Sequence, residues 1–293
     1  MQAKLIHKLT YNYPSLVKLG EHRLCLKPKN LEFQNLLEFR LNINPKPIHI
    51  YPFVAKTGDQ VHRAKFTGFT NLLEIEAISI VKTKKQPMLQ RWMLDSIKLP
   101  YPKDQLSSEL VGALSGSLPN GDYDPASIQL SLEAMNSTQQ GALAFIERLI
   151  GMIQDRIEYT ERDQGAPWPP GKTLRRKLGS CRDLAILMME CCRCVGLPAR
   201  FTSGYHLVEP APKKYNLHAW TEVYLPGAGW KSFDASGAGA IDERYITLAT
   251  SSKSELAAAV SGTFTGPVGI KSKLNWTIDV ILQQSCIHKK NHT

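Results

Sequence analysis

A cysteine at the start of a long apolar run is the residue best placed to act as a nucleophile. Cys181 follows Ser180 and precedes Asp183, and a serine followed three residues later by an acidic residue is typical of a helix start. A thiolate at the first helical position is stabilised by unpaired backbone N–H groups and the helix dipole, and Arg182 adds a cation. The pattern therefore predicts a reactive thiol at Cys181, although buried structural cysteines are the commoner kind.

A histidine and an aspartate further along the chain complete a pattern suited to acyl transfer. His218 lies in an alternating segment over residues 217–225, and a turn at residues 226–229 leads to a second segment that ends near Asp234. A turn this short predicts an antiparallel hairpin with Asp234 within a few residues of lying opposite His218. In that arrangement His218 takes the thiol proton of Cys181, Asp234 orients the imidazole, and the Cys181 backbone N–H binds the oxyanion.

Each of these residues also has a purely structural explanation. His218 can be a hydrogen-bonded strand histidine, and Asp234 can begin a turn with Ser236. The occurrence of nucleophile, base and orienting group in this order favours chemistry. His206, on the preceding strand, is a rival base without an obvious acidic partner, and Asp183 is expected to cap the helix and take no part in the reaction.

Three aromatic residues are candidates for binding the substrate. Trp220 is expected on the same strand face as His218, Trp168 lies in a proline-rich loop before the cysteine, and Tyr205 lies on the strand that precedes the histidine. Ordinary packing is the alternative role for such side chains.

The cysteines do not form a pattern typical of a metal site. Cys191 and Cys194 have the spacing of half a zinc or redox motif, but no second pair of cysteines or histidines stands nearby. No dense acidic loop offers oxygen ligands to calcium. We expect thiols in the core, no metal and no cofactor, because thiol-mediated acyl transfer needs none.

Composition and charge narrow the class of protein. The chain has 293 residues and a formal net charge of +10, but its basic residues occur as scattered pairs and one triplet without interleaved aromatic residues, which argues against a nucleic-acid partner. No apolar stretch approaches the ~20 residues of a membrane span, and the first residues lack the apolar core of a secretory signal. We expect a cytoplasmic protein whose partner is a protein or peptide substrate, with no membrane partner; a homo-oligomer is left open.

The hydrophobic pattern divides the chain into two regions. Segments of alternating apolar and polar residues occur at 37–43 and 73–77, separated by prolines and glycines, and predict an antiparallel β-sandwich. Prolines and glycines concentrated after residue 98 mark a boundary. We assign residues 1–103 to the sandwich and residues 104–293 to a second domain.

The second domain is expected to mix helices and strands. Helical spacing begins near residue 138, and a buried helix should run from Cys181 to about Val195. Three strands should follow, the last two as the hairpin described above. Alternation returns over residues 274–282, which predicts a final strand that closes the fold.

Four blocks of the second domain resemble the transglutaminase-like superfamily, and more specifically its bacterial cysteine proteases. The blocks are residues 179–185 (GSCRDLA), 196–205 (GLPARFTSGY), 218–224 (HAWTEVY) and 229–234 (GWKSFD). Residues 9–14, 19–24 and 26–28 resemble the β-rich N-terminal region of bacterial members. The resemblance implies a papain-like α+β transglutaminase core after an antiparallel β-sandwich, with Cys181, His218 and Asp234 as the catalytic triad.

Two departures from the family pattern stand after the aspartate. Family members commonly continue with proline and threonine, whereas this chain has Ala235 and Ser236. Many bacterial relatives then carry an arginine–aspartate–tyrosine stretch, and this chain has residues 249–255 (ATSSKSE). We expect these changes to affect the substrate pocket or assembly contacts and to leave the triad intact.

The expected activity is thiol-dependent acyl transfer at amide bonds, with hydrolysis by a peptidase or amidase favoured. Transfer to a lysine-like amine, as in a transglutaminase, is the alternative within the same chemistry. A non-enzymatic protein-binding module that retains the fold is the alternative outside it.

Overall fold

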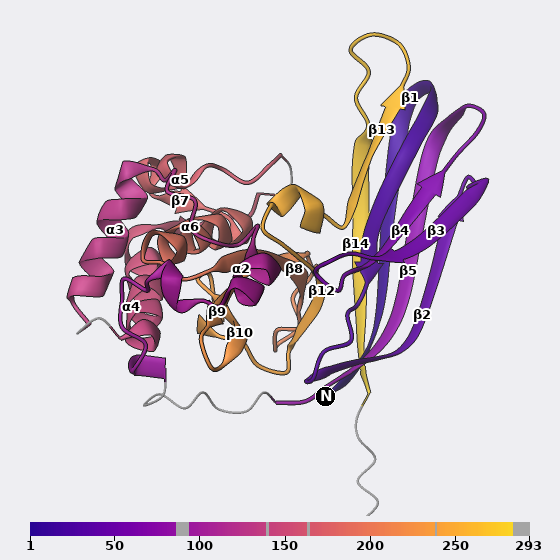
Figure 1. Ribbon diagram of the computed structural model, residues 1–293. Helices are drawn as coiled ribbons and strands as arrows, with labels where there is room; N and C mark the ends of the chain where they lie inside the picture. Colours follow the sequence, from indigo (N-terminus) through magenta and orange to yellow (C-terminus); the bar gives the residue numbers. More distant parts are fainter. Residues whose placement is uncertain (86–93, 139–140, 163–164, 238, 284–293) are drawn as a thin grey trace, which may run out of the picture.

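The computed structural model describes residues 1–85, 94–138, 141–162, 165–237 and 239–283. It contains an all-β region around the first strand and, beside it, a mixed region in which helices cover a second sheet (Figure 1). The α+β class, with an antiparallel β region followed by a mixed core, is therefore confirmed.

The all-β region is one antiparallel sheet, here called the first sheet, that curls around strand β1 (Gln2–Lys27). The first half of β1 pairs with β5 (Thr70–Thr83) and β14 (Lys273–Gln283), and β2 (Gln34–Asn44) pairs with the far side of β5. The second half of β1 pairs with β4 and β13, and β3 pairs with β4. The remaining bounds are β3 (His49–Val54), β4 (Gln60–Lys65) and β13 (Val260–Thr265). Two four-stranded layers that share β1 thus enclose one apolar core, as in a sandwich.

The two C-terminal strands belong to this first sheet. Strand β14 pairs with β1 from Gln2 opposite Gln283 to Asn12 opposite Lys273, and β13 pairs with the second half of β1. The strand predicted over residues 274–282 is β14, and it closes the fold by pairing with the first strand. A period-two pattern predicts a strand and its buried face, but it does not say which distant strand supplies the hydrogen bonds. The division of the chain at residue 103 stays a prediction.

The mixed region is built on a second antiparallel sheet, here called the core sheet, in the order β11-β10-β9-β8-β12. Its strands are β8 (Ala199–His206), β9 (His218–Leu225), β10 (Gly229–Asp234), β11 (Gly239–Ala240) and β12 (Tyr245–Ser251). The predicted hairpin is β9 and β10, with Gly229 opposite Leu225 and Phe233 opposite Thr221.

Helices cover the side of the core sheet that faces away from the first sheet (Figure 1). The helical segments are η1 (Lys103–Gln105), α2 (Ser108–Leu114), α3 (Pro125–Asn136), α4 (Ala142–Arg156), α5 (Pro170–Arg176), α6 (Cys181–Cys194) and η2 (Ser254–Ala257). Two short parallel strands, β6 (Glu158–Tyr159) and β7 (Leu178–Gly179), lead into the start of α6.

Helix α6 is the centre of the mixed region. Three of its apolar side chains, Leu184, Leu187 and Met188, are at most 2% exposed and share a core with Val223 of β9. The Thr221 hydroxyl donates to the carbonyl of Ala185, with 2.9 Å between the oxygens. This bond and the apolar contacts set the position of the helix start relative to the beginning of β9.

The two sheets are joined by a shared core and buried polar bonds. Leu5 and Val81 of the first sheet pack with Ile246 and Leu248 of β12. Lys29 and Asp59 form a buried ion pair, 2.9 Å long, and both side chains also hydrogen bond to Thr250 of β12. Breaking such a pair leaves a buried charge uncompensated, so these bonds tie the sheets to each other.

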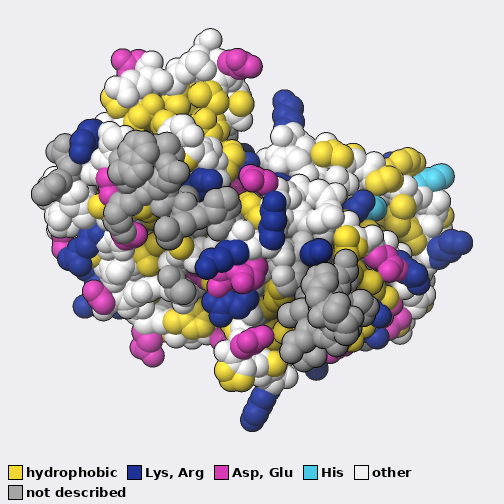
Figure 2. Space-filling view, turned by 90° about the horizontal axis from the view of Figure 1, so that it is seen from below, with side chains coloured by type: hydrophobic (Ala, Val, Ile, Leu, Met, Phe, Trp, Pro, Cys, Tyr) yellow, Lys and Arg dark blue, Asp and Glu magenta, His cyan; other side chains and the backbone are white. Residues whose placement is uncertain are grey.

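Charged side chains of both signs are interspersed on the face shown in Figure 2. This face therefore shows no single continuous basic surface. The absence of a nucleic-acid partner stays a prediction. Within the described residues, no helix has the length and apolar character needed to traverse a bilayer.

Candidate functional site

Cys181 is the first residue of α6 and lies directly after β7. Its side chain is 8% exposed and lines a pocket. The first backbone N–H groups of a helix have no partner within the helix, so the N–H of Cys181 is available to a negative charge that forms beside the sulfur.

The buried carboxylate of Asp183 holds this helix start in place. It accepts hydrogen bonds from the backbone N–H and the hydroxyl of Ser180, both at 2.8 Å, and from the backbone N–H of Trp168 at 2.6 Å. It also forms an ion pair with Arg162. Burial opposes ionisation, but these bonds lower the pKa of Asp183. Asp183 therefore fastens the loop before α5 to the start of α6, in agreement with its predicted capping role.

His218 begins β9, and its Nε2 lies 2.6 Å from Oδ2 of Asp234 at the end of β10. The hairpin register extends to Trp220 opposite Asp234, so His218 is the diagonal neighbour of the aspartate on the same face. Burial disfavours the charged imidazole, but the bond to Asp234 and the interaction with Cys181 raise the pKa of His218 to about 10. Burial by itself would raise the pKa of Asp234. The bond to the charged His218 and the two bonds from Ser236 outweigh burial and lower this pKa to about 2. The pair is therefore an imidazolium and a carboxylate at neutral pH.

Three more hydrogen bonds orient the Asp234 carboxylate. The hydroxyl of Tyr245, on β12, donates to Oδ2 at 2.9 Å. Oδ1 accepts from the backbone N–H of Ser236 at 2.8 Å and from its hydroxyl at 2.7 Å. Ser236, which departs from the family pattern, thus supplies two of the donors that fix this carboxylate.

Tyr159 is a site residue that the sequence analysis missed. It ends the short strand β6, which pairs with β7 immediately before Cys181, and its hydroxyl interacts with the Cys181 thiol. Tyr159 is 47% exposed, and its partial burial and its neighbours Cys181 and Glu161 raise the pKa of the phenol, so it is neutral at neutral pH. The sequence does not indicate its position beside Cys181, because strands of two residues are too short to show the alternation of apolar and polar residues that predicts a strand.

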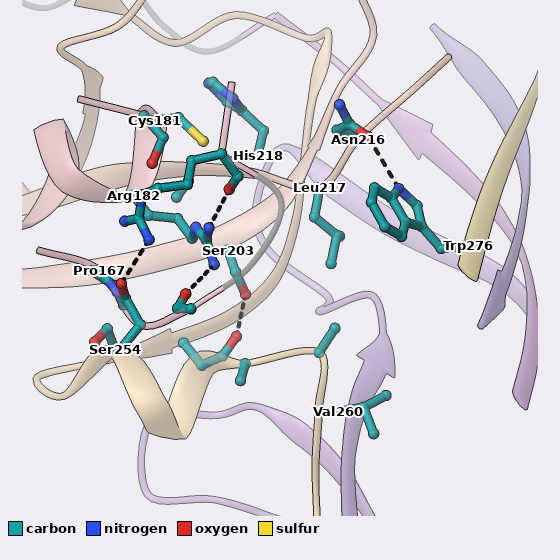
Figure 3. A pocket seen from close by; sticks show the side chains of 18 of the residues that line it. Pro167, Cys181, Arg182, Ser203, Asn216, Leu217, His218, Ser254, Val260 and Trp276 are labelled. Carbon is teal, nitrogen blue, oxygen red and sulfur yellow. Dashed lines mark hydrogen bonds between the residues drawn. The ribbon is translucent and has the colours of Figure 1, made fainter. Parts of the chain in front are cut away.

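The pocket that contains Cys181 and His218 runs between the core sheet and the first sheet (Figure 3). Its volume is about 370 Å³, within the range of small-ligand sites. Cys181 and Arg182 lie at one end of the view, and Trp276 and Val260 lie toward the strands of the first sheet. The two sheets therefore share one cavity beside the thiol.

The three aromatic residues predicted to bind the substrate do not line this pocket as the structure describes it. Tyr205 is 2% exposed, and its hydroxyl lies 3.0 Å from Nδ1 of His7 between the sheets. Trp220 is 1% exposed and packs edge-on against Tyr245. Trp168 stacks with cationic side chains while its neighbour Pro167 lines the pocket. In the structure these three aromatic side chains contact other protein side chains.

His206, the rival base, is stacked on Tyr245 with ring centroids 3.9 Å apart. Burial and the charge of His218 lower the pKa of His206 to about 4, so it is neutral at neutral pH. Ring nitrogens of both histidines and an oxygen of Asp234 lie within 4.8 Å of one another, which is a spacing that metal ligands also have. The short bond between His218 and Asp234 makes hydrogen bonding the arrangement that the geometry favours.

Comparison with known protein families gives a match for each of the two regions of the chain. Residues 130–235 match the transglutaminase-like superfamily, and residues 3–82 match the bacterial transglutaminase-like N-terminal region. The first match ends just after Asp234 and includes Cys181 and His218.

Relatives and solved structures cover most of the chain. An uncharacterised protein of Mycobacterium tuberculosis is 25% identical over 275 residues, which are 84% of this chain and 82% of its own. An uncharacterised protein of Mycobacterium leprae is 20% identical over 273 residues, 90% and 93% of the two chains. The crystal structure of a proposed cysteine protease from Cytophaga hutchinsonii superimposes with a TM-score of 0.71 and 22% identity, covering 96% of this chain and 90% of that one. This likeness shows a shared fold, with a papain-like core.

Proposed function

The chain belongs to the transglutaminase-like superfamily, and we propose that it catalyses thiol-dependent acyl transfer at amide bonds, with water as the acceptor. Cys181 is the nucleophile, His218 the acid and base, and Asp234 the group that orients the imidazole. The single observation that carries the proposal is the series of contacts from the thiol through the imidazole to the carboxylate, at the edge of an open pocket.

In the first step the Cys181 sulfur attacks the carbonyl carbon of an amide. A C–S bond forms while the negative charge moves to the carbonyl oxygen, where the backbone N–H of Cys181 can stabilise it. The imidazolium of His218 then gives its proton to the leaving nitrogen as the C–N bond breaks. The products of this step are an amine and a thioester on Cys181.

In the second step an acceptor attacks the thioester. The neutral imidazole of His218 takes a proton from water, the C–O bond forms, and the thiolate of Cys181 leaves. An amine in place of water would give a new amide, which is the transglutaminase outcome. We favour water because the sequence lacks the acidic loop of a calcium-regulated enzyme.

Selective labelling tests the nucleophile. The purified protein is treated at neutral pH with a small excess of iodoacetamide, and the modified cysteines are identified by peptide mass spectrometry. We expect Cys181 to react well before the other five cysteines, and to lose this selectivity in His218→Ala. Equal labelling of all six cysteines would contradict the proposal.

A second assay separates the three outcomes for a bound substrate. Glutamine-containing peptides are incubated with the protein, with or without a fluorescent primary amine, and the products are weighed by mass spectrometry. Hydrolysis gives cleavage or conversion of glutamine to glutamate, and amine transfer gives a labelled peptide. A protein with a reactive Cys181 that gives neither product over a broad peptide library would be assigned to the non-enzymatic class.

A further inference from the structure

We propose that the first sheet forms the far wall of the substrate cleft, and that this wall binds an apolar or aromatic side chain close to the attacked amide. The inference rests on the proposed function, because it places a substrate beside Cys181. It gives the N-terminal region and the two returning strands a role in choosing the substrate.

The wall is made by directly paired residues of two strands. Leu9 of β1 is opposite Trp276 of β14, and Tyr11 is opposite Leu274. All four line the same pocket as Cys181. Residues directly opposite in an antiparallel pair project from the same face of the sheet, so these side chains form a continuous apolar patch.

The indole of Trp276 is held in a defined position. Its Nε1 donates to Oδ1 of Asn216 at 3.0 Å (Figure 3), and the Lys214 ammonium lies 3.5 Å from its ring centroid. Asn216 lies two residues before His218. The chain segment that leads into the catalytic histidine is therefore hydrogen bonded to the wall. This bond fixes the distance between His218 and the apolar patch.

The charges around the pocket argue against an acidic substrate group. Arg182 donates to the carbonyls of Gly165, at 3.0 Å, and Arg162, so its guanidinium is engaged by the loop. Arg162 is in turn bonded to Asp183. Burial lowers the pKa of His7, at the base of the wall, to about 4, so it is neutral at neutral pH. These groups leave the apolar patch as the main source of binding free energy.

Three of the four patch residues are only partly buried, so the patch is where the core of the first sheet opens to the pocket. Tyr11, Leu274 and Trp276 keep part of their surface exposed, whereas Leu9 is 5% exposed and joins the patch to the buried core residues of the first sheet. A substrate side chain that covers this surface removes apolar area from water at about 25 cal/mol per Å².

The test compares peptide vinyl sulfones that differ in one side chain. Acetyl-Phe-Gly, acetyl-Gly-Gly and acetyl-Glu-Gly vinyl sulfones are reacted with the full chain, and the rate of Cys181 modification is followed by intact mass. We expect the phenylalanine probe to react at least ten times faster than the other two. Trp276→Ala and Leu274→Ser should remove most of this preference, and Thr277→Ala, on the exposed face of the same strand, should keep it.

Iodoacetamide is the internal standard for each variant. It is too small to need the wall, so the peptide-probe rates of each variant are divided by that variant's own iodoacetamide rate, and Thr277→Ala should keep the wild-type iodoacetamide rate. Selective iodoacetamide labelling with equal rates for the three peptide probes, or a preference kept in both wall variants, would overturn the wall and leave the triad standing. Loss of selective iodoacetamide labelling in the wild type would overturn the triad and the inference that rests on it.

Discussion

The two ends of helix α6 hold cysteines in different surroundings. Cys181, at the first position, lies beside the His218 imidazole and lines a pocket. Cys191 and Cys192, near the last turn, are fully buried, and burial raises the pKa of both thiols. The Cys191 thiol donates to the carbonyl of Ser127, with 3.7 Å between sulfur and oxygen. Burial also raises the pKa of Cys194, to about 11.

This difference shows that position and neighbours decide the chemistry of a thiol more than residue type does. At the first position the thiol lies beside an imidazolium and backbone N–H groups that have no partner within the helix, whereas near the last turn a thiolate would place a charge in an apolar core. The thiols at the far end serve as small apolar side chains. Substitutions at each end should therefore affect different properties.

Apart from loss of the Cys181 thiol itself, the largest expected effect comes from removing the His218 imidazole. His218→Ala should lower the rate of amide cleavage by about 10³-fold, because it removes the general acid and base. The measurement is single-turnover release of the amine product. His206→Ala is the matched control for a nearby histidine and should cost far less; equal losses in the two variants would show that the base has been misassigned.

Asp234→Asn should have the next largest effect, about 10²-fold on cleavage, because the imidazole loses its orienting carboxylate. The pKa of His218, about 10 with Asp234 in place, should fall toward its ordinary value of 6.5. The pH profile of Cys181 alkylation reports this change, and an unchanged profile would contradict the proposed role of Asp234.

The same pair should make stability depend on pH. His218 has a raised pKa in the folded protein, so its contribution is complete below about pH 6.5 and is lost as the pH rises to about 10. Asp234 has a lowered pKa, so its contribution is present above about pH 4 and is lost as the pH falls toward 2. Melting temperatures of the wild type and Asp234→Asn should therefore differ most between about pH 4 and 6.5.

Tyr159→Phe should lower cleavage by about 10-fold, since it removes one neutral hydroxyl donor beside the sulfur. Tyr51→Phe, on the exposed strand β3, is the control for the same chemical change away from the site. Turnover of a common peptide substrate compares them. If Tyr159→Phe behaves like Tyr51→Phe, the Tyr159 hydroxyl has no part in the reaction.

The smallest effect on activity is expected at the buried end of the helix. Cys191→Ala should leave turnover unchanged and lower the free energy of unfolding by about 1 kcal/mol, because it leaves a small cavity in the core. Cys181→Ala should show the reverse pattern, with activity abolished and stability nearly kept. Urea denaturation measures the stability of both variants, and a turnover assay measures their activity. A loss of activity in Cys191→Ala would show that the two ends of the helix are coupled.

Much of the site could be predicted from the sequence because its signals are local. The capping residues before α6 and the short turn between β9 and β10 act over a few positions, so Cys181, His218 and Asp234 could each be placed on an element. The contact between His218 and Asp234 follows from the hairpin register. The catalytic role of the three residues stays a proposal.

The sequence by itself thus determined the elements that carry the three groups, because capping, hairpin turns and periodicity depend on neighbouring residues. Only the tertiary structure decided that β14 returns to β1, that Tyr159 reaches Cys181, and that Trp168, Tyr205 and Trp220 lie outside the pocket lining. These outcomes depend on which distant surfaces pack together. Many strands of similar pattern compete for such pairings, and the free energy of the whole core selects among them.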